Sequence, residues 1–85
     1  MELQYHSWLR NRAGKAKESV SLPDGVETLA GLAEWLAKRD AVSAALFSYR
    51  SIINASVNGE MVGDWESCRL ADDDKISFFS PLAGG

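Results

Sequence analysis

The end of the sequence, residues 75–85, reads KISFFSPLAGG and places a strand signal directly before a strand terminator. Ile76, Phe78 and Phe79 have side chains that favour β-strands. Pro81 lacks the N–H that a strand ladder requires, so pairing should stop before it. The stretch therefore predicts a strand that contributes to the core and then gives way to an unpaired tail.

The tail closes with two glycines, Gly84 and Gly85. Since glycine has no Cβ, this segment can enter passages that are closed to residues with side chains. By itself the pair is a weak signal, because two final glycines arise by chance in about one chain in two hundred at average glycine usage. Together with the preceding strand it predicts a flexible tail whose reactive group is the Gly85 carboxylate.

The whole run resembles the carboxy-terminal signature of the small subunit of molybdopterin synthase, a sulfur-carrier protein of the ubiquitin-like β-grasp fold. In that family a strand with two aromatic residues leads through proline into Gly-Gly, and the matching residues here are Phe78, Phe79, Pro81, Gly84 and Gly85. Ser80 departs from the family, which often has a second proline there. A second similar segment is WLRNRAG at 8–14, and a third is the turn LADDD at 70–74, where Asp73 replaces the usual glycine.

Composition indicates one small globular domain spanning residues 1–85. The chain is 46% hydrophobic and 25% charged, which is typical of a folded protein with a small core. A net charge of −3, with basic residues scattered along the sequence, argues against nucleic-acid binding. No run approaches membrane-spanning length and no secretory signal is visible, so we expect a cytoplasmic protein without a membrane partner.

Periodicity predicts the order of elements. Period-two alternation over residues 3–8 and 18–22 indicates two strands, with Leu3 and Tyr5 facing inward and a Pro-Asp-Gly turn at 23–25 after the second strand. The connection at 9–14 is expected to be a short helical turn. The main amphipathic helix should begin after Thr28, and its apolar stripe is expected to comprise Leu29, Leu32, Ala33 and Leu36.

The second half of the chain predicts one more helix and a hairpin. Asp40 is expected to cap a shorter helix, whose apolar residues at helical spacing are Val42, Ala45, Leu46 and Tyr49. A strand over 53–57 precedes Asn58-Gly59, a strong hairpin turn signal, and a short return strand follows at 61–62. The segment 63–74 is expected to be irregular and anchored by Trp65 and Leu70.

These elements make an α+β fold, with a mixed sheet packed on one main helix. Periodicity alone does not place the strands within the sheet. The resemblance implies a β-grasp (ubiquitin-like) fold, in which the first and last strands lie side by side. One core is expected to include Leu29, Leu32, Leu36, Val57, Ile76 and Phe78.

The sequence offers little for chemistry of its own. Cys68 is the only cysteine, so neither an internal disulfide nor a cysteine metal cluster can form, and His6 would be the only imidazole partner for a nucleophilic thiol. The acidic run 72–74 lacks the spacing of a calcium-binding loop, so we interpret it as a turn. We therefore expect no metal, no bound cofactor and no enzyme activity of the chain alone.

The resemblance implies a sulfur-carrier function centred on Gly85. A ubiquitin-activating-type adenylyltransferase would use ATP to adenylate its carboxylate, and a persulfide would displace AMP to leave a thiocarboxylate. The large subunit of molybdopterin synthase, in a heterotetramer, would then receive the Gly84-Gly85 tail and pass the sulfur to cyclic pyranopterin monophosphate. By strand alternation Phe79 points outward, and with Pro81 and Leu82 it should form the surface that binds this partner.

Several alternatives remain open from the sequence. The same fold serves a thiamine-type sulfur carrier and ubiquitin-like protein modifiers, and a binding module without terminal chemistry would also fit. Trp8 is expected to point outward, where it would either cover the domain's own edge or belong to a contact surface. Arg10 and Arg12 are expected to be solvated, and a role in an interface is the alternative.

Overall fold

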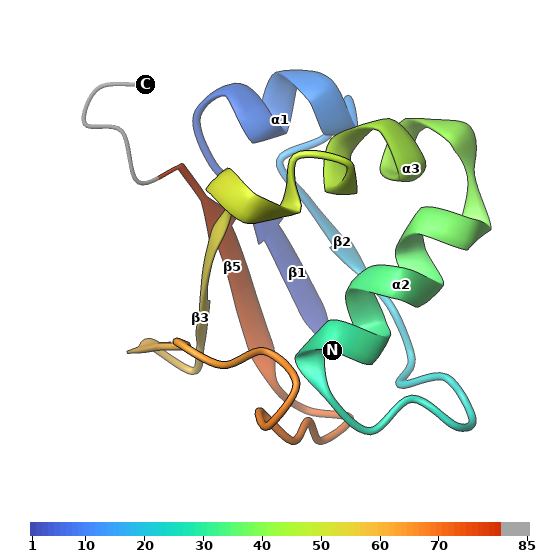
Figure 1. The fold of residues 1–85 in the computed structure, drawn as a ribbon, viewed down its shortest axis with the longest axis vertical. Coiled ribbons are helices and arrows are strands. Elements are labelled where there is room, and N and C mark those ends of the chain that lie inside the picture. Colours follow the sequence, from blue (N-terminus) through green and yellow to red (C-terminus); the bar gives the residue numbers. More distant parts are fainter. Residues whose placement is uncertain (81–85) are drawn as a thin grey trace.

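Strand β5 (Lys75–Phe79) is the central strand of a five-stranded sheet (Figure 1) in a computed structural model that describes residues 1–80. It runs parallel to β1 (Glu2–Tyr5) and antiparallel to β3 (Asn54–Val57). The outer strands β2 (Lys17–Ser19) and β4 (Glu60–Met61) pair with β1 and β3. This mixed sheet confirms the β-grasp fold, with the first and last strands side by side.

The helices pack on one face of the sheet (Figure 1). They are α1 (Trp8–Ala13), α2 (Leu29–Arg39), α3 (Ala41–Phe47) and the 3-10 helix η1 (Arg50–Ile52). The expected cap of α2 is present, because Thr28 Oγ1 accepts a hydrogen bond from the Gly31 N–H at 3.1 Å. Within residues 1–80, no helix combines the length and hydrophobicity needed to cross a membrane.

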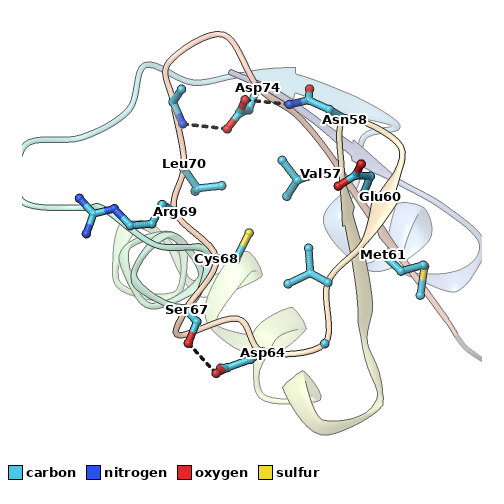
Figure 2. Close-up of a pocket in the computed structure, with 13 residues that line it drawn as sticks. Val57, Asn58, Glu60, Met61, Asp64, Ser67, Cys68, Arg69, Leu70 and Asp74 are labelled. Atoms are coloured by element: carbon cyan, nitrogen blue, oxygen red, sulfur yellow. Dashed lines mark hydrogen bonds between the residues drawn. The ribbon is translucent and has the colours of Figure 1, made fainter.

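The hairpin between β3 and β4 turns at Asn58-Gly59, as predicted. Both residues have positive φ, 53° and 86°, which Asn and Gly tolerate better than other residues. The turn is fastened to the start of β5, because Asn58 Nδ2 donates to Asp74 Oδ1 at 2.9 Å (Figure 2). The Lys75 N–H also donates to Asn58 Oδ1 at 3.0 Å. The hairpin therefore also fixes where β5 begins.

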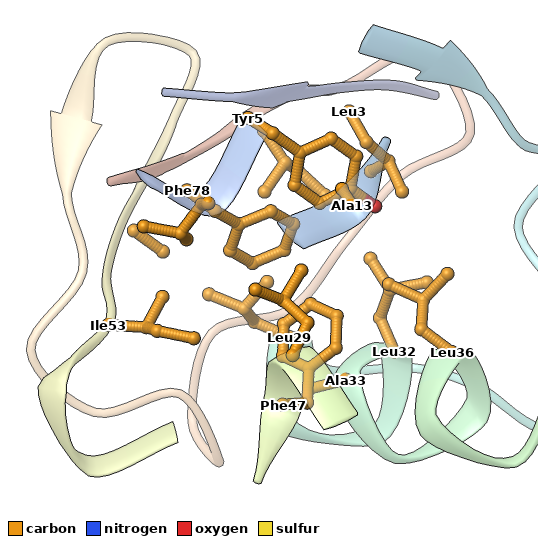
Figure 3. Close-up of a cluster of buried hydrophobic side chains, with 14 of the residues drawn as sticks. Leu3, Tyr5, Ala13, Leu29, Leu32, Ala33, Leu36, Phe47, Ile53 and Phe78 are labelled. Atoms are coloured by element: carbon orange, nitrogen blue, oxygen red, sulfur yellow. The ribbon is translucent and has the colours of Figure 1, made fainter. Parts of the chain in front are cut away.

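Phe78 of β5 lies at the centre of the core, between the sheet and the helices (Figure 3). Its ring stacks on Tyr5 at a centroid distance of 5.8 Å and meets Phe47 edge-on at 5.2 Å. Trp65, anchored as predicted, lies 5.8 Å away on another side. The expected core is confirmed: Leu29, Leu32, Leu36, Ile76 and Phe78 are fully buried, and Val57 packs partly buried against them.

Helix α3 begins at its predicted cap but turns a different face inward. Asp40 Oδ1 accepts a hydrogen bond from the Ser43 N–H at 2.7 Å, which confirms the cap. Its buried residues are Ser43, Leu46 and Phe47. Of the expected stripe only Leu46 is buried, while Val42 and Tyr49 are 51% and 41% exposed. The prediction was wrong because Ser43, Leu46 and Phe47 also follow helical spacing, and packing against α2 selects that face.

The first two strands are shorter than the alternation predicts. Leu3 and Tyr5 are buried as expected, but β1 ends at Tyr5, and Trp8 is the first residue of α1 rather than a strand residue. The chain changes direction at Ser7, whose φ of 54° and ψ of −135° are rare for a residue with a side chain. Likewise β2 stops at Ser19, before the predicted end at 22.

The acidic run 72–74 forms a turn, as interpreted. Asp72 Oδ1 accepts from the Leu22 N–H, and Asp74 Oδ2 accepts from the Ala71 N–H, each at 2.7 Å. Asp73 does not have positive φ, so an aspartate replaces the usual glycine of this turn without backbone strain. Within residues 1–80, no group of three or more His, Cys, Asp or Glu side chains is placed to hold a metal ion.

An ion-pair network ties the end of α2 to β2. Arg39 Nη1 and Nη2 donate to the two carboxylate oxygens of Glu18 at 2.8 and 3.1 Å, and Arg39 Nε donates to Asp40 at 2.8 Å. The Tyr5 hydroxyl donates to Glu18 at 2.8 Å. Burial of Glu18 would raise its pKa, but the hydrogen bonds from Arg39 and Tyr5 outweigh burial and lower the pKa below 4.5.

This network predicts a loss of stability in acid. Because the folded-state pKa of Glu18 is depressed, its contribution is present above pH 4.5 and is lost as pH falls through the lower folded value. We expect Glu18→Gln to lose less unfolding free energy than the wild type between pH 6 and 3, measured by urea denaturation. Glu34→Gln, the same change on the exposed face of α2, should follow the wild type; equal acid sensitivity of all three proteins would contradict the assignment.

Candidate functional site: the carboxy end of β5

The strand that precedes the Gly-Gly sequence is held on both sides. Phe78 pairs with Tyr5 of β1 and with Ala55 of β3, and Phe79 pairs with Asn54. The ladder extends one residue beyond β1, because the His6 N–H donates to the Phe78 carbonyl at 3.0 Å. Hydrogen bonds to both neighbouring strands thus hold the last residues of β5 in place. The position at which the following segment begins is therefore set by the sheet.

Phe79 is half-buried and lies on the sheet face opposite to Phe78, as strand alternation predicts. Its neighbours are Asn54 on β3 and, on the other side, exposed His6, which follows the pairing partner of Phe78. The predicted partner surface also includes Pro81 and Leu82, and the predicted reactive tail comprises Gly84 and Gly85. These four residues lie outside residues 1–80, so their roles stay predictions.

The sheet face around Phe79 is not covered by a helix (Figure 1). Its middle is polar, with Gln4, Ser56 and Ser77 paired across three adjacent strands. Met61 of β4 continues this row and is 63% exposed. A large exposed apolar side chain at this position adds to the apolar character that Phe79 gives to the uncovered face.

A hollow of about 790 Å³ lies at the opposite end of the sheet, between the hairpin and the segment 63–74 (Figure 2). Cys68 lines it together with Val57, Val62 and Leu70. Burial, and then the negative charge of Asp74, raise the pKa of the Cys68 thiol, so it stays protonated at neutral pH. His6 follows the far end of β1, so this structure supplies Cys68 with no imidazole partner.

Sequence reasoning missed a cluster beside the end of β5. The Trp8 ring of α1 meets the Tyr49 ring edge-on at 5.9 Å, and the Arg12 guanidinium lies 5.3 Å from the Tyr49 ring centre. Tyr49 was placed in the apolar stripe of α3, and Arg12 was expected to be solvated, with an interface role as the alternative. A signal was present, because residues 3–17 and 41–59 contain no Asp or Glu.

Comparisons with known proteins agree with this geometry. The sequence model of the ThiS family matches residues 3–85. A comparison with curated protein sequences finds no significant match. Among solved structures, small archaeal modifier protein 1 (SAMP1) of Haloferax volcanii superposes with a TM-score of 0.72 at 23% identity, over 100% of this chain and 98% of that chain.

Two further similar structures are of molybdopterin converting factor subunits. The putative molybdopterin converting factor subunit 1 of Pyrococcus furiosus has a TM-score of 0.68 at 23% identity, and the alignment covers 95% of each chain. The complex of subunits 1 and 2 of the molybdopterin-converting factor of Helicobacter pylori matches with a TM-score of 0.64 at 17% identity, over 99% of this chain and 96% of that chain. At these identities the likeness establishes a shared fold.

Proposed function

Because the chain belongs to the ThiS family of ubiquitin-like sulfur carriers, we propose that Gly85 carries sulfur as a terminal thiocarboxylate for molybdenum cofactor biosynthesis. The observation that supports this role is the central position of β5, paired on both sides up to its last residues. A strand held in this way presents the following Pro81 to Gly85 segment from a rigid base, and rigid placement is what a partner's active site requires.

Charging of Gly85 needs an activating partner. The carboxylate is ionised at neutral pH, with a reference pKa of about 3.3 to 3.7, and an anion is a poor electrophile. In the proposed reaction an adenylyltransferase of the ubiquitin-activating type joins the carboxylate to AMP from ATP and releases pyrophosphate. A persulfide sulfur then displaces AMP and forms an acyl disulfide with Gly85. A thiolate of the activating system attacks the donor-side sulfur of this acyl disulfide, forms a new disulfide with it and so releases the thiocarboxylate.

The second proposed step takes place in the large subunit of molybdopterin synthase. Gly84 and Gly85 enter its active site, and the sulfur passes to cyclic pyranopterin monophosphate. The solved complex of subunits 1 and 2 of the molybdopterin-converting factor of Helicobacter pylori, which has a similar fold, supports a second subunit as the partner. Two small and two large subunits would make the heterotetramer that the resemblance implies.

Phe79 provides a direct test of the binding face. We expect Phe79→Ala to weaken association with the large subunit by at least tenfold while lowering the melting temperature only slightly, because Phe79 is half-buried on the uncovered sheet face. Isothermal titration calorimetry and thermal unfolding would measure the two effects. A large drop in melting temperature with unchanged affinity would instead make Phe79 a core residue.

The acceptor of the sulfur is tested by reconstitution. Thiocarboxylated protein is incubated with the large subunit and cyclic pyranopterin monophosphate, or in parallel with a thiazole synthase and its substrates. We expect sulfur to be transferred to the pterin and the free carboxylate to be regenerated. Transfer only in the thiazole synthase reaction would assign the chain to thiamine biosynthesis instead.

Protein modification is the second candidate, and the similarity to a small archaeal modifier protein at a TM-score of 0.72 supports it. In this role the Gly85 carboxylate would form an isopeptide bond with a lysine of another protein. Mass spectrometry of proteins purified with the tagged chain distinguishes the two functions. Conjugates that carry Gly85 on a target lysine would support modification, whereas the thiocarboxylate without conjugates supports sulfur transfer.

A further inference from the structure

The aromatic and arginine cluster of Trp8, Arg12 and Tyr49 has the composition of a protein-binding hot spot. Trp, Tyr and Arg are the residues most enriched where truncation costs the most binding energy. Tyr49 remains 41% exposed although its ring contacts both Trp8 and Arg12. Ile52, 46% exposed, adds an apolar side chain on the next turn of the chain.

Helix α1 and the connection after α3, which carry the cluster, lie at the end of the sheet where β5 stops (Figure 1). Trp8 lies two residues after His6, whose N–H donates a hydrogen bond to the Phe78 carbonyl. On the other side, Ile52 comes two residues before Asn54, the pairing partner of Phe79. A partner that receives the segment after Phe79 therefore comes close to this cluster, even though its residues belong to α1 and to the connection after α3.

Charge is distributed unevenly over the two ends of the domain. The chain carries a net charge of −3, yet the charged residues of the two acid-free stretches are all basic: Arg10, Arg12, Lys15, Lys17 and Arg50. Acidic residues gather instead at the opposite end, in the hairpin and the segment before β5, as Glu60, Asp64, Asp72, Asp73 and Asp74. The end that carries the cluster is therefore the more basic one, although Arg69 and Lys75 lie at the opposite end.

Arg10, Arg12 and Lys17 are the exposed cations of these stretches that pair with no carboxylate of residues 1–80, and the two arginines lie on α1 beside Trp8. Lys15 pairs with Glu18 at 3.6 Å, and the Arg50 guanidinium stacks on Trp65, 3.5 Å from the ring centre. Arg10 and Arg12 are exposed and form no ion pair with any carboxylate of residues 1–80. A carboxylate-rich surface would satisfy both and would be steered toward this end.

We propose that Trp8, Arg10, Arg12 and Tyr49 form a second docking surface, which binds an acidic patch around an apolar recess on the large subunit of molybdopterin synthase. The inference rests on the proposed function, because the tail and the cluster are taken to engage the same partner. Phe79 and the tail supply the first contact region, and the cluster fixes the orientation of the domain. A nucleic acid does not fit, since the acidic opposite end and the net charge of −3 repel phosphates.

The test compares matched variants in calorimetric titrations against the large subunit from the same organism. We expect Arg12→Glu to weaken binding about tenfold at low salt, because it sets like charges against each other. The difference should shrink at 1 M salt, where the Debye length is about 3 Å. Lys38→Glu makes the same charge change at an exposed position of α2, away from the cluster, and this variant should bind like the wild type.

The aromatic part of the surface is tested separately from charge. Tyr49→Ala is expected to weaken binding at least tenfold, mainly through faster dissociation, and Tyr49→Phe should retain binding since the ring is kept. Tyr49 is chosen over Trp8 because it is 41% exposed, so its truncation should leave the fold intact; thermal unfolding of each variant measures this.

Each outcome separates this inference from the proposed function. If Phe79→Ala weakens binding and the variants of Arg12 and Tyr49 do not, the docking surface is overturned and the sulfur-carrier function stands. A slower adenylation by the activating enzyme with unchanged large-subunit affinity would also overturn it, because the cluster would then serve another partner. If the wild type binds no large subunit, both the proposed function and the inference fail.

Discussion

Adding a single alanine after Gly85 is expected to abolish charging of the protein while leaving its fold unchanged. Adenylation needs a free carboxylate at the ATP site, and one extra residue moves the reacting carbon by about 3.3 to 3.6 Å. Deleting Gly85 should have the same effect, because the shortened tail no longer reaches. Release of pyrophosphate from ATP by the activating enzyme measures the reaction.

The control for this experiment is Cys68→Ser. Cys68 lies in the hollow at the opposite end of the sheet, and its raised pKa keeps the thiol protonated. This variant should be charged at the wild-type rate. Normal charging of the extended protein, or loss of charging in Cys68→Ser, would show that the reactive group is not the Gly85 carboxylate.

Replacing Phe78 with alanine is expected to cost about 2 to 5 kcal/mol of unfolding free energy. The ring is fully buried and contacts Tyr5, Phe47 and Trp65, so its removal leaves a cavity in the middle of the core. A domain of this size has a total stability on the order of 5 to 15 kcal/mol, so the variant would lose a large share of it. Leu32→Ala on α2 should fall in the same range.

Urea denaturation measures this cost, with Val42→Ala as the matched control. Val42 is 51% exposed on α3, and its truncation should change stability by no more than about 0.5 kcal/mol. Comparable losses in the two variants would contradict the described core. Phe78→Ala and Phe79→Ala change adjacent residues of one strand and should differ in effect. Phe78→Ala should mainly lower stability, whereas Phe79→Ala should mainly weaken binding to the partner.

Local patterns in the sequence predicted the parts of the fold that local physics determines. The stripe of α2 and its Thr28 cap follow from helix periodicity, and the Asn58-Gly59 turn follows from tolerance of positive φ. The inward Phe78 and outward Phe79 follow from strand alternation. In each case the decisive residues lie within a few positions of one another.

The errors arose where distant contacts decide the outcome. Two faces of α3 have helical spacing, and only packing against α2, with the Arg39 Nη2 contact to Ser43 Oγ at 3.3 Å, selects the observed one. The early end of β1 depends on the rare conformation of Ser7, which no residue-type preference indicates. The pairing of β1 with β5 joins the two ends of the chain, and it was expected only from the resemblance.

The candidate site likewise has a part that consecutive residues predict and a part that depends on distant contacts. The sequence predicted roles for Phe79 and the Gly-Gly tail, since these predictions depend on consecutive residues alone. The cluster of Trp8, Arg12 and Tyr49 joins segments about 40 residues apart and becomes visible only when α1 packs against α3. The sequence offered two indications, the outward Trp8 and the lack of acidic residues in both segments, and neither of them joins the two segments.

The mass of the intact protein tests the central claim most directly. The purified chain is incubated with the activating enzyme, ATP and a persulfide donor and is then analysed by intact mass spectrometry and peptide fragmentation. We predict a gain equal to the mass difference between sulfur and oxygen, located in the final peptide at Gly85. An unchanged mass, or a gain located on Cys68, would contradict the assignment of this chain as a carrier of sulfur on Gly85.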